Sequence, residues 1–358
     1  MKNRFPRYRY NSYHGRGGNR RMRVILILLA LLLIACVFWI AQRYMVYCED
    51  GTFRFEFPWT QRQGEPAPAA QNDQTPAQDL EIIIEEPAPP EPHARTVLHA
   101  RELDASALQG GSTKALAALA EEDVNALVIP VKNSRGQLLY PSQLSDAAKI
   151  GAVAGGTIAA AAIAELKAAN YALSARIATL HDSLFAYAHM TDAAVEQIKY
   201  RGYVWYGPDE TFYLAPEKVL TRRYLTDVAV ECAQLGFDEL LLDEFAYPTQ
   251  GRLSNIYTAA RTVTQTQALT TLATELRSAL KSYDVRLSVV MDAETVLAGE
   301  NEISGQSLPD FAQIFDRIYV PATPEQLPAL REALGEYPAE LVPILHEAIE
   351  DGDYLIGQ

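Results

Sequence analysis

The stretch LGFDELLLDEFAYP, residues Leu235–Pro248, decides the fold. Gly236 is expected to end a helix, the apolar run Glu239–Asp243 is typical of a buried strand, and Asp243 and Glu244 stand where that strand stops. In a (β/α) barrel, the carboxyl ends of the strands form the face that carries active sites. The stretch therefore predicts a barrel strand that ends in candidate catalytic acids.

Strand and helix signals alternate from about Ala94 to the end of the chain. The expected strands are 96–100, 126–132, 172–179, 239–243, 286–292, 317–320, 340–346 and 354–357. The expected helices are 113–121, 158–169, 192–200, 219–235, 256–283, 308–314 and 324–334. This pattern predicts an α/β fold, a (β/α)8 barrel of the TIM type. An open, doubly wound sheet is the alternative, because no helix fits between the last two expected strands.

Side chains on a strand point alternately to its two faces, so the apolar pattern shows which ones enter the barrel. Leu240 and Leu242 are expected to face the surrounding helices. Leu241 and Asp243 then point into the lumen, and Glu244 turns away.

The same reasoning on three further strands adds charged side chains to the lumen. Together the four strands are expected to aim four charges into one space: Lys132, Arg176, Asp243 and Asp292. Unpaired charges are costly to bury and often mark functional sites, so this convergence predicts a pocket.

Two lumenal carboxylates suit glycoside hydrolysis, in which one acts as nucleophile or base and the other as acid. Asp243 is the expected principal catalytic group, with Asp292 as its partner and Glu244 as a third candidate. Lys132 and Arg176 are expected to bind substrate oxygens or to keep a carboxylate ionised. In the alternative interpretation, Asp243 caps a loop and Arg176 forms an internal ion pair with Glu239.

Other side chains are candidates for substrate contact because they follow expected strands. These are His181 with Asp182, and Glu347. Trp205, in YVWYGPDETFY, is a candidate aromatic platform for a sugar ring; a capping role for the first three and an ordinary packed loop for Trp205 are the alternatives. No metal-ligand spacing or phosphate-loop motif is present, so neither a metal nor a cofactor is expected.

The N-terminal part of the chain predicts a membrane anchor. Residues 1–23 hold eight Lys or Arg and no acid, and residues 24–41 form an 18-residue run without a charge. Such a run can span a bilayer, and the basic flank predicts a cytoplasmic N-terminus with the rest extracytoplasmic. A cleaved signal peptide, or lipoprotein processing at Cys36, is the alternative.

Residues 42–93 follow as a juxtamembrane segment and a linker rich in Pro, Ala and Glu, which is expected to be disordered. Residues 94–358 form the expected barrel domain. The net charge of -14 argues against a nucleic-acid partner, because phosphate binding needs clustered positive charge.

Five segments resemble a family described as putative glycosyl hydrolases, which are extracytoplasmic bacterial (β/α) barrels related to glycosidases. The segments, in chain order, are ALVIPVKNSRGQLLY, ARIATLHDS, GFDELLLDEFAYP, ISGQSLPDFAQIFDRIYVP and LVPILHEA. The resemblance implies that Lys132, Arg176, Asp182 and Asp243 occupy family positions.

The chain also departs from that family's pattern. Pro130 and Ala215 stand where acids are common, and Glu244 and Ala246 replace a tyrosine and an arginine. Sequence and resemblance together predict a membrane-anchored glycoside hydrolase that acts on cell-wall or environmental polysaccharide, such as peptidoglycan glycan. A catalytically inactive glycan-binding domain, or an envelope scaffold on the same barrel, is the alternative.

Overall fold

A computed structural model describes residues 45–47, 53–55, 97–153, 158–208 and 210–357 of the chain. It divides into two compact units, Met1–Ala88 and Pro89–Gln358. In the first unit, β1 (Met45–Tyr47) pairs antiparallel with β2 (Phe53–Phe55). Within the described part of the chain, no helix is both long and apolar enough to cross a membrane. The expected anchor at residues 24–41 and most of the linker lie outside the described residues.

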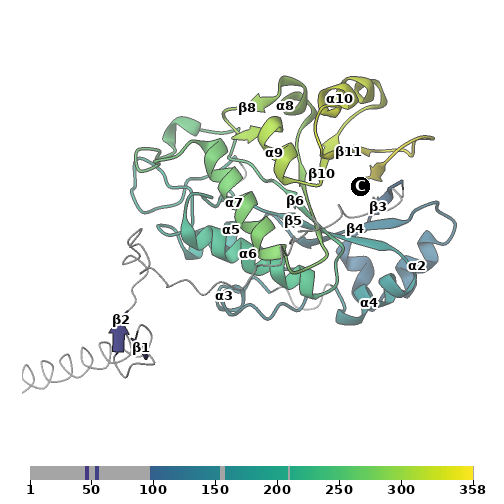
Figure 1. Ribbon diagram of the computed structural model, residues 1–358, viewed down its shortest axis with the longest axis horizontal. Coiled ribbons are helices and arrows are strands. Elements are labelled where there is room, and N and C mark those ends of the chain that lie inside the picture. The colour runs from purple at the N-terminus through teal and green to yellow at the C-terminus, as the bar shows by residue number, and fades with distance from the viewer. Residues whose placement is uncertain (1–44, 48–52, 56–96, 154–157, 209, 358) are drawn as a thin grey trace, which may run out of the picture. The chain divides into compact units, whose positions relative to one another are not determined.

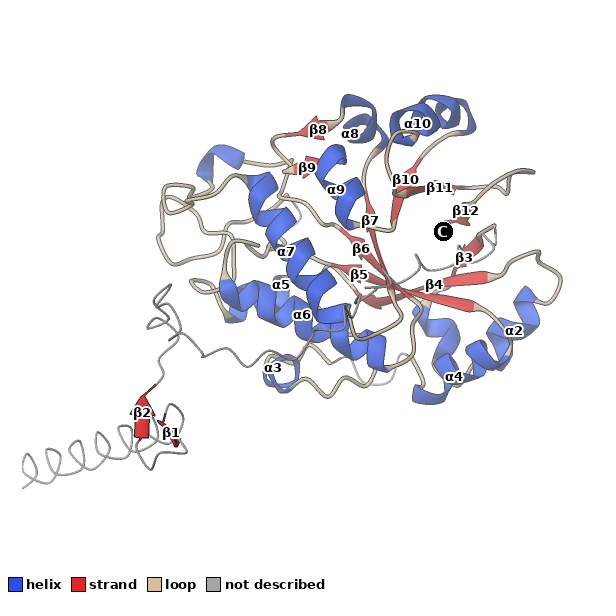
Figure 2. Ribbon diagram, viewed as in Figure 1, coloured by secondary structure: helices blue, strands red, loops and turns tan. Residues whose placement is uncertain are grey.

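The second unit is a closed barrel of parallel strands, as expected, and not an open sheet. Around the barrel the strand order is β10, β11, β12, β3, β4, β5, β6 and β7. In chain order the strands are β3 (His99–Glu102), β4 (Ala126–Lys132), β5 (Ala172–Ala178), β6 (Glu239–Asp243), β7 (Arg286–Val290), β10 (Arg317–Pro321), β11 (Glu340–Leu345) and β12 (Tyr354–Ile356). The strands meet at the centre of the unit, with helices around them (Figure 2).

The larger helices agree with the sequence pattern. They are α2 (Thr113–Leu119), α4 (Ala160–Ala168), α6 (Val219–Gln234), α7 (Gln265–Leu280), α9 (Leu308–Ile314) and α10 (Leu327–Leu334). Gly236 follows the end of α6 with φ of 97°, a backbone conformation that favours glycine. Figure 1 shows α6 and α7 side by side on the outside of β5 and β6, an arrangement that their mutual contacts support.

Several local predictions were wrong. Residues 192–200 form no helix but an irregular ribbon with isolated bridges, including Glu196 to Val204. Helix α7 begins at Gln265 rather than 256, because Thr264 and Gln267 form a capping box that starts it. Short segments that were not expected are α3 (Ser145–Lys149), α5 (Ser183–Ala188), α8 (Ala293–Ala298), β8 (Glu300–Asn301), β9 (Gln306–Ser307), and the 3₁₀ turns η1 (Ala105–Leu108), η2 (Leu253–Asn255) and η3 (Pro324–Gln326).

Two apolar cores lie on the two sides of the barrel wall. Leu240 and Leu242 belong to the large core between strands and helices. Leu241 belongs to a smaller core that fills the barrel interior together with Tyr319 and Val342. The predicted alternation of β6 is therefore confirmed, and Asp243 shares the inner face with Leu241.

A buried carboxylate stands below that inner core, where β6 begins. Glu239 is 3% exposed and pairs with Arg317 at 3.0 Å. Three hydroxyls also contact its carboxylate, from Ser174 at 2.9 Å, Ser288 at 2.5 Å and Tyr319 at 3.2 Å. Burial, and then the charge of Glu239, raise the pKa of Tyr319 well above its ordinary value, so its hydroxyl stays a donor. The charge is thus fully compensated inside the barrel.

The substitution Arg317→Met should lower the free energy of unfolding by about 3–5 kcal/mol, because it leaves Glu239 buried without a cation. Urea unfolding followed by circular dichroism measures the change. Arg331→Met, at an exposed position, is the matched control. A loss below about 1 kcal/mol for Arg317→Met would show that the hydroxyls alone compensate the charge.

Candidate active site

Three strands bring charged side chains together at the carboxyl end of the barrel. Arg176 of β5 contacts Glu102 of β3 through Nη1 at 2.8 Å. It also contacts Asp243 Oδ2 of β6 through Nε at 2.8 Å and Nη2 at 2.7 Å. Burial on its own would lower the pKa of Arg176, but the two carboxylates outweigh it and raise that pKa. Arg176 therefore stays charged and pairs with both carboxylates.

The alternative pairing of Arg176 with Glu239 is wrong, since Glu239 pairs with a different arginine. Arg176 serves Asp243 and Glu102 near the mouth, and Arg317 serves Glu239 further down. About a quarter of the side chain of Arg176 and of Asp243 remains exposed, at 25% and 23%. A substrate in the mouth of the barrel can therefore reach both groups.

Glu244 adopts a strained backbone at the next position. Its φ is 51°, a left-handed conformation that costs a residue with a Cβ roughly 1–2 kcal/mol. Its N–H donates to Asp243 Oδ1 at 2.8 Å, and its carbonyl accepts from Leu180 N at 3.3 Å. Strain of this kind, imposed by the surrounding structure, is common at functional sites.

The strained backbone directs the Glu244 side chain toward His181. Glu244 Oε1 lies 3.2 Å from His181 Nδ1 and accepts from the Ser134 hydroxyl at 3.2 Å. The His181 ring is stacked on Tyr213, with centroids 4.4 Å apart and planes inclined by 6°. Glu244, which the alternation of β6 turned away from the lumen, thus has its own polar partners at the barrel mouth.

Two polar atoms of this pair have no hydrogen-bond partner among the described residues. They are Glu244 Oε2 and His181 Nε2, and both atoms are buried. A buried polar atom without a partner costs about 1–3 kcal/mol, and such an atom often awaits a ligand or a water. Each side chain of the pair thus keeps one polar atom that no described residue contacts.

Lys132 and Asp182 form a buried ion pair and do not line the mouth. Both side chains are 0% exposed, and Lys132 Nζ lies 3.0 Å from Asp182 Oδ2. A register shift at the end of β4 pairs Lys132 with Ile177, whose side chain packs in the outer core. The lysine is therefore turned out of the lumen, where alternation alone had placed it. Neither side chain can touch a substrate directly in this arrangement.

This ion pair supports the loops that carry the site. Lys132 Nζ also donates to the carbonyl of Ala178 at 2.6 Å, at the end of β5. Asp182 Oδ1 accepts from Phe185 N at 2.8 Å and so caps α5. Because Asp182 follows His181, the pair fixes the backbone from which His181 reaches Glu244.

The remaining candidates take local roles. Asp292 is exposed and caps α8, accepting from Thr295 N and from the Thr295 hydroxyl, both at 2.8 Å. Trp205 is only 2% exposed, and its Nε1 donates to the carbonyl of Arg252, so it is a packed loop residue and not an open platform. Glu347 is exposed in the connection after β11. Among the described residues, no group of His, Cys, Asp or Glu is arranged to hold a metal ion.

Sequence reasoning missed Glu102, Ser134 and Tyr213. The expected first strand stopped at 100, whereas β3 runs to Glu102, and alternation from Ala100 would have pointed Glu102 inward. Ser134 and Tyr213 lie on long connections, where no periodic signal shows which strand end they approach.

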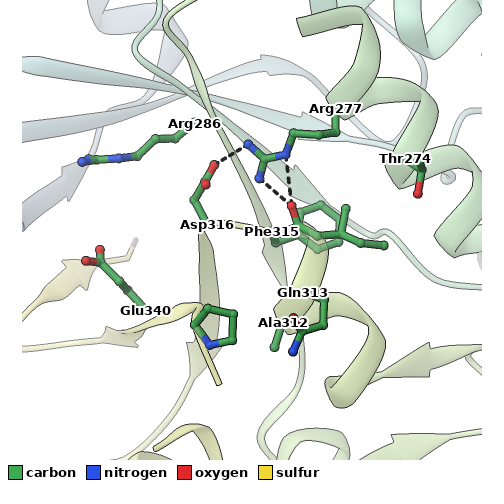
Figure 3. A pocket seen from close by; sticks show the side chains of 10 residues that line it. Thr274, Arg277, Arg286, Ala312, Gln313, Phe315, Asp316 and Glu340 are labelled. Carbon is green, nitrogen blue, oxygen red and sulfur yellow. Dashed lines mark hydrogen bonds and ion pairs between the residues drawn. The ribbon is translucent and has the colours of Figure 1, made fainter. Parts of the chain in front are cut away.

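A cavity of about 650 Å³ lies at the other end of the barrel, where the strands begin (Figure 3). Arg277 lines it and pairs there with Asp316 at 2.9 Å, while also donating to the carbonyl of Ile314. These contacts hold α7 against the start of β10. In barrels of this kind the amino-terminal end serves stability, so we place the candidate site at the mouth despite this cavity.

Comparison with known proteins identifies the family of the chain. The model of the family described as "putative glycosyl hydrolase domain" matches residues 104–324. The chain belongs to this family. The match spans β4 to β10 and includes Arg176, His181, Asp243 and Glu244. A search of curated proteins found no match.

Several solved structures align with this chain. The glycoside hydrolase domain of PgaB (BpsB) from Bordetella bronchiseptica aligns with a TM-score of 0.53 and 13% identity, over 70% of this chain and 84% of that one. A hypothetical protein from Ruminiclostridium thermocellum aligns with a TM-score of 0.47 and 18% identity, over 52% and 95%. The Flavobacterium johnsoniae chitobiase aligns with a TM-score of 0.48 and 13% identity, over 70% and 38%. The likeness to the Bordetella domain shows a shared (β/α) barrel fold.

The substitution Gly136→Ala should destabilise the protein by disturbing the buried ion pair that supports the site. Gly136 has φ of 90°, and a Cβ there would overlap Asp182 Oδ1. The Asp182 carboxylate must then shift, which disturbs its contact with Lys132, so we expect a loss of about 2–4 kcal/mol in the free energy of unfolding. Urea unfolding measures it. Gly110→Ala is the control, because a Cβ at Gly110 meets nothing within 4 Å. Equal stability of the two variants would contradict the proposed importance of the ion pair.

Proposed function

We propose that the barrel is a glycoside hydrolase in which Asp243 and Glu244 are the two catalytic carboxylates. The observation that carries this proposal is their unequal surroundings at one strand end. Asp243 pairs with the Arg176 guanidinium, whereas Glu244 contacts no Arg or Lys among the described residues and has one oxygen bound and one buried without a partner. Two acids in different environments are what acid catalysis beside a fixed negative charge requires.

Glu244 takes the role of acid and base. Its Oε1 accepts from Ser134 and lies 3.2 Å from His181 Nδ1. In the proposed tautomer, Nδ1–H donates to Oε1, which leaves Oε2 to carry the proton. Glu244 donates this proton to the glycosidic oxygen as the bond to the anomeric carbon breaks. Water then adds to the anomeric carbon, and its proton returns to Glu244. In this tautomer His181 Nε2 is an acceptor for a sugar hydroxyl.

Asp243 stabilises the positive charge that develops on the sugar ring. It faces the lumen from the end of β6, and Arg176 fixes its orientation through two nitrogens. Glu102 contacts the same guanidinium through Nη1, so one cation serves two carboxylates. We prefer Glu244 to Asp292 as the partner of Asp243, because Thr295 engages both oxygens of Asp292.

The proposal keeps the location that the sequence predicts. Residues 24–41 would anchor the chain in the cell membrane, with the barrel outside, where cell-wall or environmental polysaccharide is the accessible substrate. The family membership and the barrel fold support a glycan as the ligand.

An inactive glycan-binding domain is the second candidate. It is favoured by the tight pairing of Asp243 with Arg176, which leaves that carboxylate partly neutralised before any substrate arrives. The two candidates differ in turnover, since a binding domain releases no product.

Glu244→Gln and Asp243→Asn should each lower kcat by at least about 100-fold on a responsive polysaccharide, because each removes a charge or proton that the reaction uses. Reducing-sugar release from peptidoglycan and from neutral polysaccharides measures turnover, and circular dichroism checks folding. Asp292→Asn is the matched control, since asparagine also caps helices and only the charge is lost.

Two results would contradict the assignment of Glu244 and Asp243 as the catalytic carboxylates. Full activity in Glu244→Gln together with loss in Asp292→Asn would move the acid to Asp292. Binding of glycan with no product from the wild-type chain would favour the inactive binding domain.

A further inference from the structure

The connection between β5 and α6 carries an unusual concentration of exposed aromatic rings. Among the described residues, four tyrosines are more than half exposed: Tyr187, Tyr200, Tyr203 and Tyr206, at 58%, 55%, 57% and 53%. All four lie on this one connection. Apolar groups gathered in this way on the surface of a soluble domain usually mark a binding site.

Three of the rings on this connection form one contiguous surface, which we call the tyrosine surface: Tyr187, Tyr206 and Phe212. Tyr187 and Phe212 are stacked, with centroids 5.9 Å apart and planes inclined by only 19°. Tyr206 meets Phe212 edge-on at 5.1 Å. Phe212 is half-buried and packs on the main core, so it anchors the two exposed tyrosines.

The tyrosine surface is joined to the candidate active site through the backbone of this connection. His181 and Tyr213 form a bridge between two antiparallel segments, and their rings are stacked. Phe212 precedes Tyr213, and its carbonyl accepts from Asp182 N at 3.1 Å. The same short ribbon therefore presents His181 to Glu244 and the tyrosine surface to solvent.

We propose that the tyrosine surface binds an uncharged stretch of the polysaccharide that is cleaved at Glu244. The ligand class rests on the proposed function. The tyrosine surface adds that the substrate is a long chain, which is bound there at sugars away from the linkage that is cleaved. Tyrosine suits this ligand, because its ring stacks on the apolar face of a sugar while its hydroxyl stays in water.

Charge favours an uncharged glycan over an acidic one. The chain has a net charge of -14 although its first 23 residues hold eight Lys or Arg and no acid, so the rest is strongly acidic. A polyanion would be repelled by such a surface, whereas ring stacking needs no charge on the ligand.

Affinity electrophoresis of the full-length protein tests the proposal. The gels contain glycol chitin, hydroxyethyl cellulose, xylan, mannan or, as an acidic comparison, polygalacturonate. We compare the wild type with Tyr187→Ala, Tyr206→Ala and the double variant. For the gels, each of these proteins carries Glu244→Gln so that the polymer stays intact; for hydrolysis, each keeps Glu244. Ile303→Ala is the matched control, because Ile303 is 55% exposed on a different connection.

At least one uncharged polymer should retard the wild type and Ile303→Ala equally. Each tyrosine variant should bind that polymer about 5- to 10-fold more weakly, the double variant more weakly still, and hydrolysis of a short oligosaccharide should be unchanged. Equal retardation of wild type and double variant, or retardation by no uncharged polymer, would overturn the proposal. So would preferential binding to polygalacturonate, or a wild-type dimer that the double variant cannot form.

Failure of this inference is distinguishable from failure of the proposed function. Hydrolysis that Glu244→Gln abolishes, with binding that ignores the tyrosines, refutes only the tyrosine surface. Tyrosine-dependent binding without any hydrolysis refutes only the enzyme.

Discussion

The structure depends on one geometric constraint, the alternation of side chains along a strand inside a closed barrel. Strand β6 sends Glu239, Leu241 and Asp243 inward in turn. The three residues supply a compensated charge below, an apolar layer in the middle and a reactive carboxylate at the mouth. Because a one-residue slip would turn all three into the outer apolar core, packing of Leu240 and Leu242 also keeps Asp243 in place.

The inner apolar layer separates two ionic groups of different purpose. Below it, Glu239 is enclosed by Arg317 and three hydroxyls, and its environment leaves no access for a ligand. Above it, Arg176 joins Asp243 and Glu102 while a part of each stays exposed. The difference is one of solvent access, and it is what makes the upper group a candidate site and the lower one a structural element.

The proposed function at the barrel mouth depends on the strained backbone of Glu244, which the surrounding structure keeps in a left-handed conformation. The left-handed conformation of Glu244 is offset by contacts with Asp243, Leu180, His181 and Ser134, which come from three different connections or strands. The buried pair of Lys132 and Asp182 in turn holds two of those connections. Lys132 and Asp182, which no substrate can reach, thus help to set the position of Glu244 at the barrel mouth.

The sequence by itself determined the barrel, the order of its strands and the inward direction of Arg176 and Asp243. These follow from periodicity and from the residues at strand ends, which are local properties. Only the tertiary structure decided that Lys132 leaves the lumen, that Asp292 caps a helix, that Trp205 is packed and that Glu244 meets His181. The register shift of Lys132 and the positive φ of Glu244 depend on neighbours distant in sequence, and the capping bond of Asp292 depends on where α8 begins. No period in the chain encodes these features.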